Sequence, residues 1–92
     1  MDQSELLQWV KDNSEGLDPE EVQHVAMCCH HIQRWYHEGY PLGGFLTAVV
    51  RNDFMGVCFS ADATNLKALR IYALFLTWQL PEAYRKKAGG ES

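Results

Sequence analysis

Three shortages in this sequence each exclude a class of protein: it has few bases, no long apolar run and only three cysteines. Eight basic residues stand against twelve acidic ones, which gives a net charge of −4. Duplex DNA and anionic membranes both favour a basic excess, so we expect neither as the main partner. No apolar stretch approaches the ~18 residues that a membrane span needs, and residues 1–11 are too polar for a signal peptide. We therefore expect a cytoplasmic protein.

The cysteine pattern argues against a disulfide framework. The count is odd, and Cys28 and Cys29 are adjacent, with Cys58 far along the chain. Neighbouring side chains on a helix point about 100° apart and cannot easily bridge. Reduced thiols agree with a cytosolic protein.

Apolar and aromatic residues, in contrast, are plentiful. They make up 47% and 12% of 92 residues, a length that forms one domain. A domain of this size buries only roughly 60–65% of the surface of its unfolded chain. Either the core is unusually aromatic or a partner covers part of the surface, and the sequence leaves both open. We expect a homo-oligomer, because small domains with surplus apolar surface often associate.

Helix signals dominate the first half of the chain. Apolar spacing predicts a helix over residues 4–12. Asp18, Pro19 and Glu21 supply a cap, a first-turn proline and a capping-box partner, so a second helix is predicted from there to about residue 37. Gly39 is a residue type that commonly ends a helix.

Two further helices are predicted in the second half. Residues 45–54 are apolar and contain alanine, which favours a helix ended by Gly56, although a valine-rich run can also form a strand. Residues 54–59 then form a short apolar loop. Ser60 or Asp62 caps a last helix that runs to about Leu80 and is stopped by Pro81. That helix is apolar on two sides, so it is central or lies in an interface.

Four helices with short connections predict an all-α, small four-helix bundle-like domain over residues 1–92, with residues 85–92 as a flexible tail. We expect it to be oligomeric because of the two-sided last helix and the three tryptophans, Trp9, Trp35 and Trp78.

One group of side chains is of the types that bind metal. His24, Cys28 and His31 fall on one helical face, and Cys58 could supply a fourth ligand. Structural zinc sites show paired short spacings at two places in a chain, and this sequence does not. We therefore expect buried thiols and surface histidines, with no metal and no cofactor. The sequence also has no activated-thiol or nucleophile-elbow signature, so we expect no enzyme.

A glycine pair at a predicted helix start gives the candidate ligand site. Backbone N–H groups there can hold an anion, and glycine lets a phosphate come close. Two nearby aromatic rings could stack on a nucleobase, and three basic side chains could pair with phosphate. The simpler alternative is a tight turn in which a side chain would clash. The predicted ligand-binding residues are Tyr40, Gly43, Gly44, Phe45, Arg51, Asn52, Lys67 and Arg70.

Polar pairs on either side of residues 54–59 have a structural interpretation. Asn52 with Asp53, and Asp62 with Asn65, carry side chains that cap helices and fix turns.

A longer motif carries a resemblance. Residues 41–54 read PLGGFLTAVVRNDF, and residues 61–65 read ADATN. This resembles a large group of short proteins encoded by bacteriophages and prophages, in which a P-x-G-G-F-L-x-A-V-L-x-N-D-L run is followed by A-D-x-x-N and a helix ending near a proline. The resemblance covers residues 39–81, and no established activity comes with it.

The resemblance implies a small accessory viral protein that acts by binding in the host cell cytoplasm. It could be an anti-defence sponge that sequesters a phosphorylated nucleotide signal, an inhibitor or adaptor that covers a host protein, or a structural helical oligomer. The shared motif favours the nucleotide-binding alternative, since a fixed motif suits a fixed ligand better than it suits diverse host surfaces.

Overall fold

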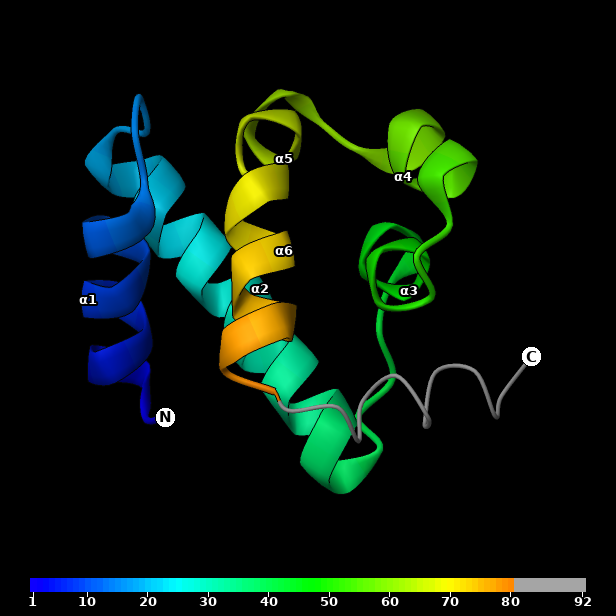
Figure 1. Cartoon of the computed structure of the whole chain (residues 1–92), viewed down its shortest axis with the longest axis horizontal. Coiled ribbons are helices and arrows are strands. Elements are labelled where there is room, and N and C mark those ends of the chain that lie inside the picture. The colour runs from blue at the N-terminus through cyan, green and yellow to red at the C-terminus, as the bar shows by residue number, and fades with distance from the viewer. Residues whose placement is uncertain (81–92) are drawn as a thin grey trace.

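The computed structural model describes residues 1–80, and helices are the only regular elements in that part of the chain. The helices are α1 (Gln3–Asn13), α2 (Pro19–Glu38), α3 (Gly44–Val50), α4 (Phe54–Ser60), α5 (Ala63–Lys67) and α6 (Leu69–Trp78) (Figure 1). The all-α prediction is confirmed, but the described residues form six helices where four were predicted. The predicted tail at residues 85–92 and the helix stop at residue 81 lie outside the described residues.

α2 begins at the predicted Asp18 cap, whereas α1 begins one residue earlier than predicted, at a cap that was not predicted. α1 opens on Asp2 and α2 on Asp18, and each aspartate accepts a 2.8 Å hydrogen bond from the N–H of a glutamate three residues later. The glutamate side chain accepts in return from the aspartate N–H, which completes a capping box at both helices. α2 ends at Gly39, whose left-handed φ of 73° lets its N–H bond to the Trp35 carbonyl.

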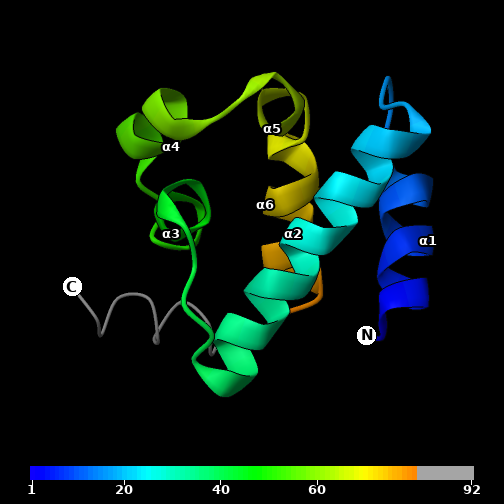
Figure 2. The same ribbon diagram turned by 180° about the vertical axis from the view of Figure 1, so that it is seen from behind.

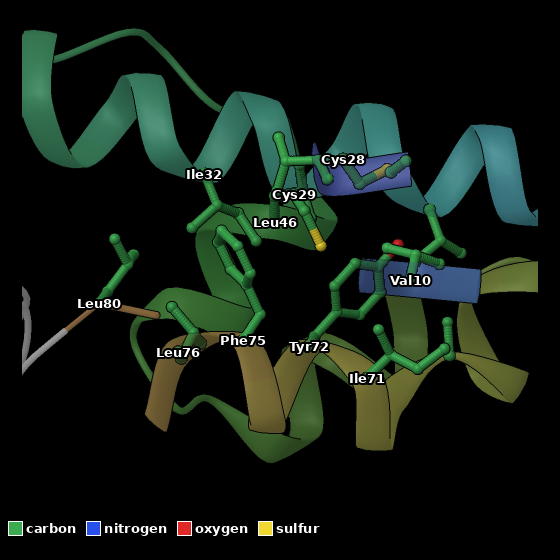
Figure 3. Close-up of a cluster of buried hydrophobic side chains, with 14 of the residues drawn as sticks. Val10, Cys28, Cys29, Ile32, Leu46, Ile71, Tyr72, Phe75, Leu76 and Leu80 are labelled. Carbon is green, nitrogen blue, oxygen red and sulfur yellow. The ribbon is translucent and has the colours of Figure 1, made fainter. Parts of the chain in front are cut away.

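The core lies where α2 and α6 face each other (Figure 3). Cys29 and Ile32 of α2 are fully buried against Tyr72 and Phe75 of α6. Aromatic rings from other helices pack onto the same two rings: Trp9 of α1 lies edge-on to Phe75 at 5.6 Å, and Phe45 of α3 lies edge-on to Tyr72 at 5.7 Å. The core is therefore strongly aromatic.

This packing buries most of the apolar surface that led us to expect an oligomer. Both apolar sides of α6 are largely covered within one chain, and Trp9 and Trp35 pack into the core. Of the three tryptophans, only Trp78 is exposed, at 74%.

One polar side chain is buried in this core. Asn65 is 7% exposed, and its Oδ1 accepts a 2.7 Å hydrogen bond from the Tyr72 hydroxyl. Burial raises the pKa of Tyr72, so the hydroxyl keeps the proton that it donates. This buried pair fixes how α5 meets α6.

The continuous last helix was a wrong prediction, because the chain bends at Ala68 between α5 and α6. Ala68 is fully buried, and its N–H bonds to the Asn65 carbonyl three residues back, which tightens the last turn of α5. The predicted cap at Asp62 is confirmed, since its carboxylate accepts from the Asn65 N–H at 2.8 Å.

The larger error concerns the chain between α3 and α5. We predicted one helix over residues 45–54, ended by Gly56, and then a loop, whereas α3 ends at Val50 and the supposed loop is α4, with Gly56 inside it. Asn52 takes a left-handed φ of 56°, which asparagine adopts more readily than most residues. Asp53 then caps α4 by accepting from the Gly56 N–H at 3.0 Å. The predicted turn-fixing and capping roles of Asn52 and Asp53 are confirmed.

Figure 2 shows α3 and α4 as a pair beside the group formed by α1, α2 and α6, and α4 packs mainly on α3. Gly56 allows α4 to pack closely on α3, because glycine has no Cβ. A Cβ at that position would lie 3.1 Å from the Ala48 Cβ of α3 and would collide with the Asp53 carboxylate that caps α4.

Two glycine substitutions are expected to change stability in opposite directions. Gly56→Ala should destabilise the fold by about 1 kcal/mol, since overpacking and a displaced cap outweigh the helix propensity gained. Gly44→Ala meets no atom within 4 Å, so it should stabilise by roughly 0.4–1 kcal/mol. Urea unfolding followed by circular dichroism measures both. Equal effects in the same direction would contradict the α3–α4 packing.

Candidate functional site

The predicted ligand site centres on Gly43 and Gly44, and the local fold requires neither glycine. Gly43 caps α3 with a φ of −70°, and Gly44 is the first residue of the helix. An added Cβ at either position would meet no atom within 4 Å. The alternative of a turn in which a side chain would clash is therefore wrong.

The two aromatic rings predicted to stack on a base already have neighbours. The Tyr40 ring lies 5.1 Å from the His31 ring, and the Arg34 guanidinium carbon lies 4.3 Å from its centroid. Phe45 is half-buried and packs against Tyr72 in the core. A base could stack on these rings only by displacing those contacts.

The three basic side chains predicted to bind phosphate do not surround the glycine pair either. Arg51 follows the far end of α3, about 10 Å along the axis from Gly44 at 1.5 Å per residue. Lys67 belongs to α5, where its Nζ lies 3.0 Å from a carboxylate oxygen of Glu21. Arg70 is exposed on α6. Within one chain, the predicted residues therefore do not form one phosphate site.

Glu21 accounts for the position of Lys67. Its carboxylate accepts from the Asp18 N–H, from Lys67 and from the Thr64 hydroxyl, at 3.0–3.2 Å. The Asp18 backbone bond and the Lys67 bond hold the pKa of Glu21 below its ordinary value. The carboxylate thus joins the start of α2 to α5, which gives Lys67 a structural role.

The histidine and cysteine side chains considered for a metal divide between surface and core. Cys28 Sγ lies 3.8 Å from Nε2 of the exposed His24, whereas His31 lies against the tyrosine ring of the following loop. Cys29 is fully buried, and Cys58 is exposed on α4. Across residues 1–80, no three histidine, cysteine, aspartate or glutamate side chains gather so that they could hold a metal ion.

An open groove of about 330 Å³ lies between α1 and α2. Glutamine, serine, histidine and apolar side chains line it, without lysine, arginine or carboxylate: Gln3, Ser4, Leu7, Gln23, Ala26, Met27 and His30. It has no cation to hold a phosphate.

The most distinctive surface feature is the outer side of α4. Phe54 is 72% exposed, Met55 59% and Phe59 82%, and Cys58 is exposed between them. On a helix, positions i, i+1, i+4 and i+5 share one side, while Val57 on the opposite side is buried. We call these four residues the α4 face.

Helix capping explains why the α4 face points outward. The Asp53 cap, Gly56 and the buried Val57 attach the other side of α4 to α3. Our sequence reasoning missed this surface because it treated the segment as a loop. The capping signal was present, since an aspartate directly precedes the apolar run.

The size of the α4 face can be estimated from its two rings. At ~200 Å² for a full side chain, Phe54 and Phe59 together expose roughly 300 Å². This alone reaches the ~300–600 Å² typical of the largest apolar patch on a monomer, which is often functional. If this area were buried, the gain in free energy would be about 7.5 kcal/mol at ~25 cal/mol/Å².

Among residues 1–80, no helix is both long and apolar enough to cross a membrane.

Comparisons with protein-family models, with curated proteins and with solved structures find no match to this chain. The resemblance to short phage proteins therefore stays a prediction.

The reactivity of the three cysteine thiols tests whether Cys28 and Cys29 are buried and Cys58 is exposed. Burial raises the pKa of the Cys28 and Cys29 thiols, and the thiolate is the reactive form. In dilute native protein we expect iodoacetamide to modify Cys58 and to reach the adjacent pair only after unfolding in urea. Peptide mass spectrometry shows which cysteines are modified before and after unfolding. Equal rates of modification at all three cysteines in native protein would contradict the burial of Cys28 and Cys29 on α2.

Proposed function

We propose that this chain is a non-enzymatic binding protein that acts by associating with protein through the α4 face. One observation carries the proposal: an ordered helix, capped and packed on one side, holds two phenylalanines and a methionine in water on the other.

The chemistry of the α4 face suits a protein partner better than a nucleotide. No charged residue occurs between Asp53 and Asp62, so the face offers no cation to a phosphate. Aromatic residues and methionine are enriched, and charged residues depleted, at the centre of protein interfaces. A few such side chains often supply most of the binding free energy.

Nucleotide sequestration has weaker support. It rests on Gly43 and Gly44, which have open space around them and no side-chain cap at the start of α3. A phosphate there would still need cations, and Lys67 is engaged by Glu21.

Catalysis also has weak support in the described residues. The thiol nearest a histidine, Cys28, is buried with a raised pKa, and the exposed thiol, Cys58, lies among apolar side chains. Neither arrangement activates a nucleophile. The phage context and the host cytoplasm remain part of the proposal and rest on the motif in residues 41–65.

Site-specific photo-crosslinking tests the proposal. Benzoylphenylalanine is placed at position 59 of the α4 face and, in a matched variant, at position 78, where Trp78 is similarly exposed on α6. Irradiation in bacterial cells should yield protein adducts from position 59 and few from position 78, because only the α4 face is a binding surface. Met55→Lys should abolish the adducts from position 59.

Two results would contradict the proposal. One is an equal yield of adducts from positions 59 and 78. The other is calorimetric binding of a linear or cyclic nucleotide that is lost in Arg51→Ala or Arg70→Ala, which would favour the sponge instead.

A further inference from the structure

We infer that the α4 face is occupied by a second copy of this chain, with the two α4 helices packed antiparallel about a two-fold axis. The inference rests on the proposed function, since it takes the α4 face to be a protein-binding surface and names the partner.

The arrangement of side chains on the α4 face is self-complementary. At 100° per residue, Met55 and Cys58 lie in the middle of the face, and Phe54 and Phe59 lie at its two edges. The small thiol at the centre lets two helix axes approach to the ~8 Å lower limit of helix packing. In an antiparallel pair, Met55 of one copy would lie level with the small Cys58 of the partner subunit, twice by symmetry, and Phe54 and Phe59 would each line the same edge of the interface as their own copies.

Charge favours the antiparallel arrangement. Arg51 is exposed just before α4, and Asp62 is exposed just after it. Antiparallel helices bring the Arg51 end of each α4 to the end at which Asp62 of the partner subunit lies, so opposite charges face each other at both ends of the pair. A parallel pair would place each Asp53 beside its own copy, and like charges would repel.

The available area predicts a weak dimer. A stable interface buries about 800 Å² on each partner. The two rings supply roughly 300 Å² of this, and the remaining residues of the face, with the polar rim from Arg51 to Asp62, must supply the rest. Small interfaces of this kind are transient, so we expect a dissociation constant in the micromolar range.

Analytical ultracentrifugation from low to high micromolar concentration tests the inference. The wild-type chain should pass from monomer to dimer. Phe59→Lys should weaken dimerisation at least about thirtyfold, as expected for an interface hot spot. Trp78→Lys, which changes a similarly exposed ring on α6, should leave the constant unchanged.

Chemical crosslinking tests the centre of the pair, and a charge substitution tests its direction. A short bismaleimide should link Cys58 to the same residue of the second copy in wild-type protein and in Trp78→Lys, but not in Phe59→Lys or Cys58→Ser. Asp62→Asn keeps a capping side chain while removing the charge, so it should weaken the dimer by a few fold without changing the helical spectrum. Phe59→Ser replaces Phe59→Lys if the latter loses helical structure.

The outcomes separate this inference from the proposed function. A wild-type monomer at high micromolar concentration, or a dimer that survives Phe59→Lys, overturns the two-fold pairing. If that monomer still gives photo-adducts with another protein from position 59, the proposed function stands with a different partner. A monomer without adducts overturns both.

Discussion

The left-handed turn at Asn52, followed by the Asp53 cap, is the constraint on which the candidate surface depends. In α3, Leu46 and Val50 form a buried row four residues apart. If the helix continued, Phe54 would be the next member of that row and would follow it toward the core. The turn interrupts the row, so Phe54 starts a new helix with a different orientation and is 72% exposed. A local backbone conformation thus decides whether an apolar run becomes core or surface.

Local signals predicted the parts of the fold that depend on nearby residues. The capping box at the start of α2, the left-handed Gly39 at its end and the Asp62 cap of α5 each depend on residues only a few positions apart. These features have strong short-range causes, which is why their limits agree with the structure to within about a residue or two.

Tertiary contacts determined the rest, and the sequence does not show them. The bend at Ala68 accompanies a buried Asn65–Tyr72 hydrogen bond. Lys67 was assigned to a ligand but pairs with Glu21, 46 positions away. Most of the aromatic side chains that we expected at the surface pack against Phe75 and Tyr72 in the core. The exposed apolar residues lie instead on α4, which we had predicted to be a loop.

The α4 face requires that residues 54–60 form an ordered helix whose apolar side faces solvent in the isolated chain. Backbone NMR chemical shifts of the Phe59→Lys variant, in which the dimer is weakened at least about thirtyfold, test this helix. We expect helical shifts from Phe54 to Ser60, preceded by a left-handed residue at Asn52. Coil-like shifts across this segment, or helical shifts running without interruption from Gly44 through Phe54, would contradict it.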